Sequence, residues 1–356
     1  MTRRSVVVKV GTTSVTDAHG GVDTGVLAAI ARDVTALRSE GWQVAVVTSG
    51  AITAGWAEVG AGRRRPTDAV TLQAVSAVGQ PLLMHAWRDA FGVLGVPVGQ
   101  VLLAPLDFAH RGQYLQARGT LESLARLGVV AVVNENDAVA DEEIRFGDND
   151  RLAALVANLV SASHLVLLTD TVGLLTADPR LDPTATLIDE VAAIDADLME
   201  IAGASRSGVG SGGMASKLAA ARLATWSGVT VIIGAARTPE PLRSVLGSRR
   251  GGTRFRPRPD RLAARKAWIA FAAPSRGSVT VNEGAVEALV HGGRSLLRVG
   301  VVARSGDFAQ GDAIDVLDVG GARVAKGLAR MDAATLDTEE GDVVVHRDDL
   351  VVLRAR

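Results

Sequence analysis

Two lysines stand out as candidates for chemistry on phosphate groups. The 356-residue chain has 38 Lys plus Arg residues, of which only four are Lys. Two of the four, Lys9 and Lys217, lie in the glycine-containing segments VVVKVGTTSV and GVGSGGMASKL. An ammonium group is a compact point charge whereas a guanidinium is a planar fork, so these lysines indicate a site that needs a point charge. Binding and transferring a phosphate is such a task.

The segment before Lys217 has further features of a phosphate site. Ahead of a predicted helix it places Gly208, Gly210, Gly212 and Gly213. Backbone N–H groups and the positive end of the helix can therefore approach a phosphate. No G-x-x-x-x-G-K-[ST] pattern occurs and no G-x-G-x-x-G follows the first predicted strand, so neither a Walker A loop nor a dinucleotide-binding loop is predicted. The alternatives are a flexible surface loop for this segment and, for Lys9, a strand-end lysine that reaches solvent.

Two segments rich in carboxylate and amide side chains form a second group of candidates. They are NEND at residues 134–137 and FGDND at residues 146–150. Carboxylates can hold an ammonium group, and amides can hold other polar groups. We therefore expect the two segments to line a polar pocket. Asp148 or Asp150 could in addition cap the helix that follows.

The elements that must position these residues indicate an α/β fold. Up to about residue 247, short β-branched runs alternate with helical patterns, which predicts an open, mostly parallel sheet sandwiched by helices. The predicted strands are Ser5–Val10, Gln43–Thr48, Val96–Leu103, Val129–Val133, His164–Thr169 and Val229–Ile233. The predicted helices are Asp23–Ser39, with Asp23 or Thr24 as N-cap, Asp68–Phe91, Arg111–Leu127, Arg151–Val160 and Gly213–Ser227.

Polar residues follow four of these strands directly. They occupy positions 11–14, 49–51, 134–137 and 169–170. Any one cluster could be an ordinary turn. In an open parallel sheet, however, ligands bind beyond the carboxyl ends of the strands, and all four clusters fall there. The sequence therefore predicts one binding site along this edge of the sheet.

The chain changes character at residues 249–265. This segment holds seven Arg, two Pro and a Gly pair without apolar periodicity, and we expect it to be a linker. Beyond it, short strands separated by Gly turns predict a small β-barrel. The predicted organisation is a catalytic domain at residues 1–248, a linker at 249–265 and a β-barrel domain at 266–356.

The composition excludes several classes of protein. The chain has no Cys, and its six His residues show no paired ligand spacing, so neither disulfides nor a metal cage are predicted. Nowhere do 18 apolar residues run together, which predicts no membrane span and a soluble, cytoplasmic protein. The net charge of −1 gives the whole chain no general attraction to nucleic acid or membrane surfaces.

Six motifs, in this order, resemble the glutamate 5-kinase family of the amino-acid kinase fold. They are VVKVGTTS, VVTSGAI, VVNENDAV, FGDND, LLTDTVGLLTADPR and GSGGMASKLAAA. In the tail, RGSVTVNEGAVEAL and GRSLLRVGVV are similar to the PUA module of many bacterial members. The resemblance covers essentially the whole chain. It departs from the family pattern at Thr171, Val172, Leu175, Ser211 and Ser216.

Carried over motif by motif, the resemblance implies roles for particular residues. Phosphoryl transfer would depend on Lys9, Lys217 and Asp150, with Asp150 organising the two lysines. Nucleotide contacts would come from Lys9, Thr169, Asp170, Ser211, Gly212, Gly213, Met214, Ala215, Ser216 and Lys217. Glutamate contacts would come from Ser49, Asp137 and Asn149. The metal-coordinating residues stay unknown.

The resemblance implies ATP-dependent phosphorylation of the side-chain carboxylate of L-glutamate to L-glutamyl 5-phosphate, the first step of proline biosynthesis. Mg²⁺ would enter with ATP. A homo-oligomer, proline as feedback inhibitor and functional coupling to glutamyl phosphate reductase are implied as well.

Two alternatives stay open. One is another kinase of the same fold, acting on acetylglutamate, aspartate, carbamate or uridylate. The other is an RNA-binding protein, because PUA modules elsewhere bind RNA. Residues 268–356 carry 10 Lys plus Arg against 13 Asp plus Glu, a net charge of 10 − 13 = −3. RNA binding needs a local excess of positive charge, so we expect no nucleic-acid partner.

Overall fold

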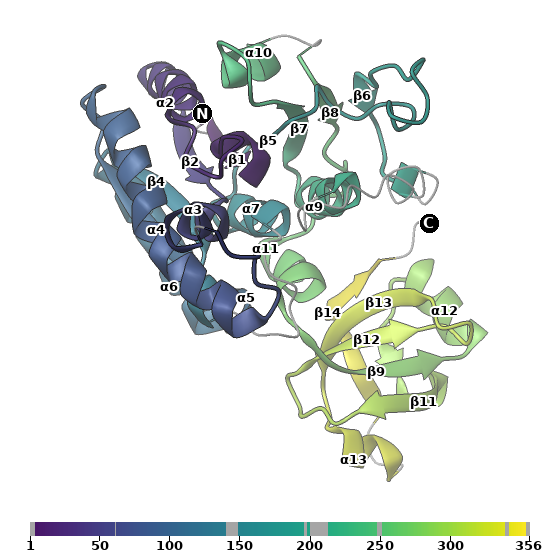
Figure 1. Cartoon of the computed structure of the whole chain (residues 1–356). Coiled ribbons are helices and arrows are strands. Elements are labelled where there is room, and N and C mark those ends of the chain that lie inside the picture. The colour runs from purple at the N-terminus through teal and green to yellow at the C-terminus, as the bar shows by residue number, and fades with distance from the viewer. Residues whose placement is uncertain are drawn as a thin grey trace. The chain divides into compact units, whose positions relative to one another are not determined.

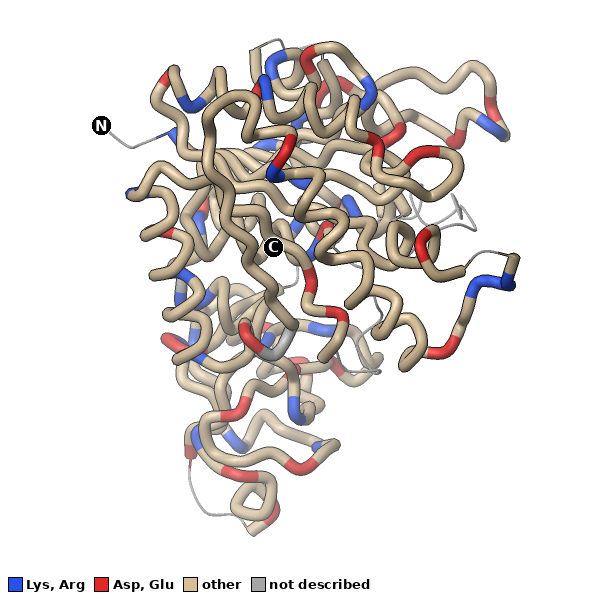
Figure 2. The backbone as a smooth tube through the Cα atoms, turned by 60° about the vertical axis from the view of Figure 1, so that its left-hand side comes forward, with Lys and Arg blue, Asp and Glu red and all other residues tan. Residues whose placement is uncertain are grey.

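The structure is a computed structural model that describes residues 4–60, 62–139, 149–195, 198–199, 213–247, 251–338 and 342–353. The chain divides into two compact units (Figure 1). The first comprises Met1–Asp107 and Arg111–Arg261, and the second comprises Phe108–His110 and Leu262–Arg356. Acidic and basic residues are scattered over the backbone tube, and both signs occur throughout the view (Figure 2). In the described part of the chain, no helix is both long and apolar enough to cross a membrane.

The first unit is built around an eight-stranded sheet with the strand order β3-β4-β2-β1-β5-β7-β8-β6. The strands are β1 (Ser5–Val10), β2 (Gln43–Val47), β3 (Val98–Leu103), β4 (Val130–Glu135), β5 (His164–Thr169), β6 (Glu190–Val191), β7 (Thr230–Ala235) and β8 (Thr253–Phe255). All pairs from β3 to β7 are parallel, whereas β8 runs antiparallel to β7. The predicted mostly parallel sheet is confirmed.

The helices of the first unit include all five that the sequence predicts. The described helices of six or more residues are α2 (Thr24–Ser39), α3 (Ala51–Val59), α4 (Ala69–Gly92), α6 (Arg111–Arg126), α7 (Asn149–Leu159), α9 (Met214–Trp226) and α10 (Pro241–Gly247). Shorter ones are α1 (Thr12–Val15), α5 (Pro105–Ala109) and the 3₁₀ turn η1 (Asp137–Val139). Asp23 caps α2 and Asp68 caps α4, because each side chain accepts a hydrogen bond from a backbone N–H of the first turn.

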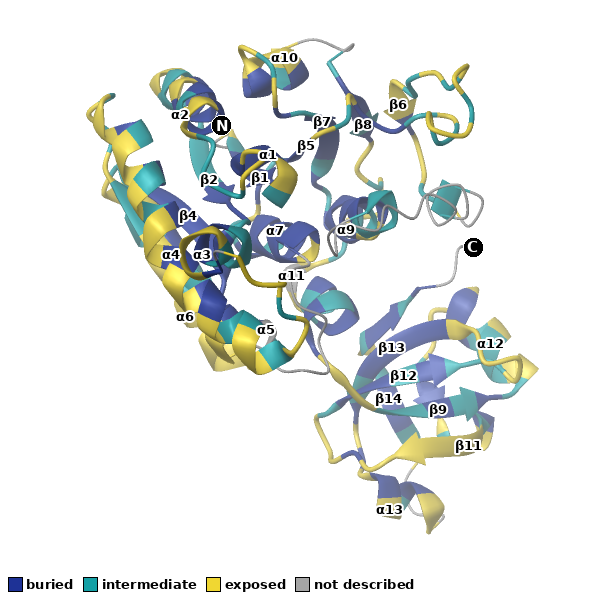
Figure 3. Ribbon diagram, viewed as in Figure 1, coloured by how far each residue is buried: buried dark blue, intermediate teal, exposed yellow. Residues whose placement is uncertain are grey.

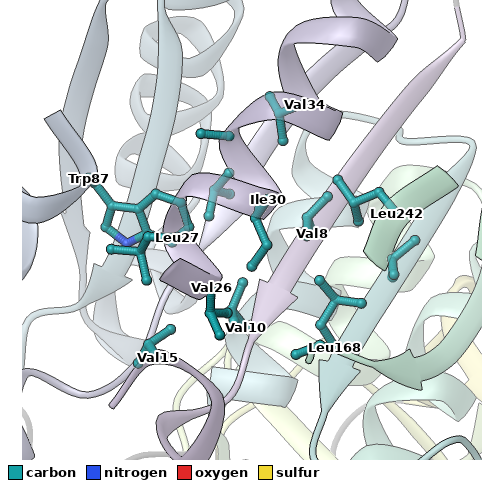
Figure 4. Close-up of a cluster of buried hydrophobic side chains, with 14 of the residues drawn as sticks. Val8, Val10, Val15, Val26, Leu27, Ile30, Val34, Trp87, Leu168 and Leu242 are labelled. Atoms are coloured by element: carbon teal, nitrogen blue, oxygen red, sulfur yellow. The ribbon is translucent and has the colours of Figure 1, made fainter. Parts of the chain in front are cut away.

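Alternation along β1 decides which side chains enter the core and which face the site. Val8 and Val10 pack against α2, and Trp87 of α4 and Leu242 of α10 join the same cluster (Figure 4). Lys9 points to the opposite face, which α7 covers. β1, β4, β5 and β7 of this sheet are largely buried, while the outer sides of α4 and α6 are exposed (Figure 3). The core therefore holds β1 rigidly with Lys9 near its carboxyl end.

Two glycines let α3 and α4 approach each other closely. A Cβ atom on Gly79 of α4 would overlap the carbonyl oxygen of Ala51, and one on Gly55 of α3 would overlap that of Val75. A third glycine, Gly50, has a φ of +102° and turns the chain from β2 into α3. L-residues with side chains avoid this conformation. Glycine at these positions therefore fixes the place of both helices beside the end of β2.

Part of the segment predicted to be a linker is a strand. Within residues 249–265, β8 pairs with β7 and extends the sheet of the first unit. Thr253 and Phe255 are buried, whereas Arg254 between them is half-buried. A strand of three residues among so many arginines gives too short an alternation to be read from sequence, so the linker prediction is wrong for this stretch.

The second unit is a curled sheet with the order β10-β14-β13-β12-β9-β11. Its strands are β9 (Ser275–Val281), β10 (Leu296–Leu297), β11 (Val301–Gly306), β12 (Ala313–Leu317), β13 (Arg323–Ala329) and β14 (Val343–Val352). All pairs are antiparallel except β9 with β12. The accompanying helices are α11 (Ala264–Ala267), η2 (Trp268–Ala272), α12 (Glu283–Val290), η3 (Arg298–Gly300) and α13 (Ala333–Asp337). The predicted small barrel is confirmed as a half-barrel.

Candidate active site

Three charged side chains meet at the carboxyl edge of the sheet. Lys9 comes from β1, Asp150 from the first turn of α7 and Lys217 from the first turn of α9. The Lys9 Nζ lies 2.7 Å from Asp150 Oδ1, and the Lys217 Nζ lies 3.2 Å from Asp150 Oδ2. Their exposed fractions are 5%, 1% and 5%, so the alternative of a solvent-reaching Lys9 is wrong. We call these three residues the charged triad.

The triad brings two ammonium groups to one buried carboxylate. Burial alone would raise the pKa of Asp150, but the charges of Lys9 and Lys217 and their hydrogen bonds lower it below its usual value. The carboxylate therefore stays ionised and holds both ammonium groups in place. Two ammonium groups thus converge on one buried carboxylate, and an anionic phosphoryl group could bind to this pair of positive charges.

The start of α9 adds backbone donors beside the triad. Gly213 is its N-cap and supplies no side-chain cap, and the Ser216 hydroxyl lies 3.4 Å from Asp150 Oδ2. The first N–H groups of a helix have no partner within the helix, and they favour anions. Four residues predicted to contact the nucleotide thus lie in the same helical turn as Lys217: Gly213, Met214, Ala215 and Ser216. Ser211 and Gly212 lie outside the described residues.

Thr169 ends β5, the neighbour of β1, and Asp170 follows it. The Thr169 hydroxyl donates to Asp170 Oδ1 at 2.9 Å, and Thr169 is buried while Asp170 is exposed. The backbone N–H of Gly11 after β1 donates to the carbonyl of Leu168 at 3.2 Å. Both residues, which are predicted to contact the nucleotide, thus lie at the predicted edge of the sheet. Among the described contacts, they do not bond to the triad.

A chain of amide side chains leads away from the triad on its other side. Asn149, which precedes Asp150, has its Nδ2 2.9 Å from Thr48 O, 2.8 Å from Ser49 Oγ and 3.0 Å from Asn134 Oδ1, and the two hydrogens of the amide are shared among these three acceptors. Asn134 in turn donates to Gln80 Oε1 at 3.1 Å, and Gln80 donates to the carbonyl of Glu135 at 3.1 Å. We call Gln80, Asn134 and Asn149 the amide chain. The structure thereby brings together two of the residues predicted to bind glutamate, Ser49 and Asn149.

The third residue predicted to bind glutamate, Asp137, forms a hydrogen bond with α4. The Ser76 hydroxyl donates to Asp137 Oδ2 at 2.5 Å, and both side chains are buried. Burial raises the pKa of Asp137, and the hydrogen bond from Ser76 offsets only part of this effect. A buried carboxylate with a raised pKa gains most from a cationic partner, such as a substrate ammonium group.

Sequence reasoning missed the residues that α4 contributes to the site. Ser76 and Gln80 lie one turn apart, and Trp87 two turns further on donates from Nε1 to Thr48 Oγ1 at 3.0 Å. All three are buried. Polar side chains at positions i and i+4 on the buried side of a helix were the signal that could have found them.

The described residues provide no ready-made metal cage. No group of three or more His, Cys, Asp or Glu side chains among them is arranged to hold a metal ion. Asp150, the most buried carboxylate of the site, is already committed to two lysines. The residues that would contact a metal therefore stay unassigned.

Comparison with known proteins identifies the family of the chain. Residues 4–235 match the amino acid kinase family, and residues 277–350 match the PUA domain. The glutamate 5-kinase of Nocardia farcinica is 48% identical over 359 residues, covering 98% of this chain and 96% of that protein. The chain belongs to the glutamate 5-kinases of the amino acid kinase family. Two further glutamate 5-kinases, from Synechococcus sp. (strain JA-3-3Ab) and Frankia casuarinae, are 43% and 46% identical. They cover 99% and 98% of this chain, and 99% and 97% of their own length is matched.

Proposed function

We propose that this member of the amino acid kinase family transfers the γ-phosphoryl group of ATP to the side-chain carboxylate of L-glutamate. The products are L-glutamyl 5-phosphate and ADP, and the reaction is the first step of proline biosynthesis. The charged triad is the observation that carries this proposal, because two buried ammonium groups with one carboxylate suit an anionic reaction centre. The full-length similarity to glutamate 5-kinases supports glutamate as the acceptor.

The chemistry requires charge compensation more than proton transfer. A glutamate side chain, whose ordinary pKa is ~4.3, is ionised at neutral pH and can attack phosphorus without a general base. The difficulty is the approach of one anion to another, and the spread of charge over the transferred oxygens. Lys9 and Lys217 would stabilise that charge, and Asp150 would keep both ammonium groups in place. Removing one such preorganised group typically costs ~10² to 10³ in rate.

The α-ammonium and α-carboxylate groups of glutamate, which we call the amino-acid head, would bind where the amide chain and Asp137 lie. Asp137 offers a buried carboxylate for the ammonium group of glutamate. Ser49 and Asn149 belong to one hydrogen-bonded group beside the triad. Asn149 and Asp150 are consecutive, and successive helical residues point about 100° apart. The head and the reacting carboxylate would therefore lie on different sides of the α7 N-terminus.

The nucleotide would bind at the ends of β5 and α9. The residues proposed for it are Lys9, Thr169, Asp170, Lys217 and the turn from Ser211 to Ser216, whose first two residues lie outside the described part. Mg²⁺ would arrive with ATP, since it keeps several waters and is usually held by phosphates and one or two carboxylates. No residue of the chain is assigned to it.

Further properties belong to the same proposal. The enzyme would be cytoplasmic and homo-oligomeric, would be inhibited by proline, and would act together with glutamyl phosphate reductase. The bounds of the catalytic domain, residues 1–248, and of the PUA-like domain, residues 266–356, also stay proposals.

The direct test is a coupled ADP-release assay with four acceptors at equal concentration. Glutamate should give turnover at least about tenfold above that with acetylglutamate, aspartate or carbamate, because one mismatched polar group costs about 1–3 kcal/mol. Preference for another acceptor would refute the proposal and assign a different kinase of this family. Absence of any ADP release, with RNA retained in a filter-binding assay, would favour the RNA-binding alternative.

A further inference from the structure

The amide chain has a single direction, which its backbone neighbours fix. The N–H of Glu135 donates to one end of the Asn134 amide at 2.9 Å, so that end must be the oxygen. The carbonyl of Glu135 accepts from Gln80, so the Gln80 atom there must be the nitrogen. Thr48 O can only accept, so the Asn149 atom that faces it must also be the nitrogen.

This direction leaves the Asn149 amide with unequal ends. Its nitrogen faces three acceptors, whereas its Oδ1 is buried and has no hydrogen-bond partner among the described residues. An unpaired buried acceptor costs free energy. Turning the amide over would pair nothing better, because Oδ1 would then face Thr48 O and Asn134 Oδ1. The surrounding hydrogen bonds therefore hold Asn149 in this orientation.

The orientation determines what Ser49 can do. Ser49 Oγ accepts from Asn149 Nδ2 at 2.8 Å. A hydroxyl that accepts a hydrogen bond still has its own proton to donate. Ser49 is therefore poised as a donor, and a hydroxyl donor suits an anionic group of the substrate.

We infer that Gln80 is a positioning residue: through Asn134 and Asn149 it fixes the Ser49 hydroxyl as a hydrogen-bond donor to the α-carboxylate of the substrate. The inference rests on the proposed function, because it takes the substrate to be an α-amino acid with a second carboxylate. The second carboxylate meets the triad, so the first is the one left for Ser49. Gln80 itself would touch no substrate atom.

A different residue of α4, Ser76, would position the side chain that binds the ammonium group of the substrate. Ser76 holds Asp137 and is not part of the amide chain. The two halves of the head, carboxylate and ammonium, would thus be positioned by two residues four apart on one helix. Changing either residue should weaken the recognition of its own half only.

Two glutamate analogues distinguish these halves. 4-Aminobutyrate lacks the α-carboxylate, and glutarate lacks the ammonium group, while both keep a terminal carboxylate. Each would be measured as an inhibitor of glutamate phosphorylation in the wild type, Gln80→Met and Ser76→Ala. The wild-type assay with glutamate tests the proposed function alone, so a failure there is separate from a failure of this inference.

For Gln80→Met we expect the apparent KM for glutamate and the Ki of glutarate to rise about tenfold, as for one lost hydrogen bond to a charged group. The Ki of 4-aminobutyrate and the KM for ATP should stay within about twofold. Ser76→Ala should weaken glutamate and 4-aminobutyrate and spare glutarate. Gln116→Met, at an exposed position of α6, is the matched control.

Three outcomes would overturn the inference. One is an unchanged KM for glutamate in Gln80→Met, and another is equal weakening of all three ligands, which a merely structural role would produce. The third comes from a double-mutant cycle: in a Ser49→Ala background, Gln80→Met should have little further effect, and an additive loss would separate the two residues. If Gln80→Met does not fold, as thermal unfolding would reveal, Gln80→Glu replaces it, because a carboxylate cannot donate to the carbonyl of Glu135.

Discussion

Replacing Asp150 by Asn tests the charged triad directly. Asp150→Asn keeps the size of the side chain and removes the negative charge that bridges two buried ammonium groups. In the variant, Lys9 and Lys217 repel each other without a shared counter-charge. We expect them to move apart, so that the phosphoryl group no longer finds both charges in place.

The size of the effect follows from the two distances. At 2.7 and 3.2 Å and an effective dielectric constant of about 20, each pair contributes roughly 5–6 kcal/mol of gross attraction. The cost of burying the charges offsets much of this, and removing one partner of a buried pair costs about 3–5 kcal/mol. The turnover should fall by about 10² to 10³, as for other preorganised charges.

The assay is ADP release at saturating ATP and glutamate, with thermal unfolding measured in parallel. Glu122→Gln is a matched control, since it removes the carboxylate of an exposed ion pair with Arg118 on α6 and should change stability by at most about 1 kcal/mol. Wild-type turnover within about threefold in folded Asp150→Asn protein would refute the role given to the triad.

Three further predictions concern the rest of the site and the chain. Lys217→Arg should not restore the turnover that Lys217→Ala loses, because a planar guanidinium does not occupy the position of an ammonium group; wild-type turnover in either variant would contradict this. The pKa of Asp137 is raised, so glutamate binding should weaken as the pH falls through that pKa and the carboxylate becomes neutral. The KM for glutamate should then rise on the acid side, and a pH profile that Asp137→Asn leaves unchanged would exclude this assignment. A chain ending at Arg261 should stay folded and active, whereas one ending at residue 248 loses β8 and should melt at a lower temperature; equal melting temperatures would show that β8 adds nothing.

The sequence was informative where residue type follows directly from the position of a strand. β2 and β5 carry uninterrupted apolar runs, β1 carries one that only Lys9 interrupts, and the polar residues after them mark the carboxyl edge of the sheet. The motifs then indicated which of these residues act on phosphate. Their roles stay predictions, although the structure places Lys9, Asp150 and Lys217 in contact.

The contribution of α4 could not be read in the same way. Ser76 and Gln80 lie 61 and 55 residues before the groups they bond, Asp137 and the carbonyl of Glu135. Within the helix they look like ordinary polar residues. Only the close approach of α4 to α3, which two glycines permit, turns them toward the site.

The scarcity of lysine is a less specific signal than the composition suggests. Lys326 of β13 is as buried as Lys9, and its Nζ donates to the carbonyl of Ala273 in the second unit. A buried ammonium group that pairs with a backbone carbonyl serves the local structure of the half-barrel. Their positions, near the carboxyl end of β1 and in the first turn of α9, distinguish the two lysines of the candidate active site.

The glycine pair between α3 and α4 has a consequence for how this enzyme could change its substrate. Ser76 and Gln80 flank Gly79 on the same helix, so the spacing between the two helices would set the width of the proposed pocket for the amino-acid head. A single methyl group at position 79 would push α4 outward and carry both residues with it. Acceptor preference could therefore shift through the packing of two helix backbones, without any change in a side chain that touches the substrate.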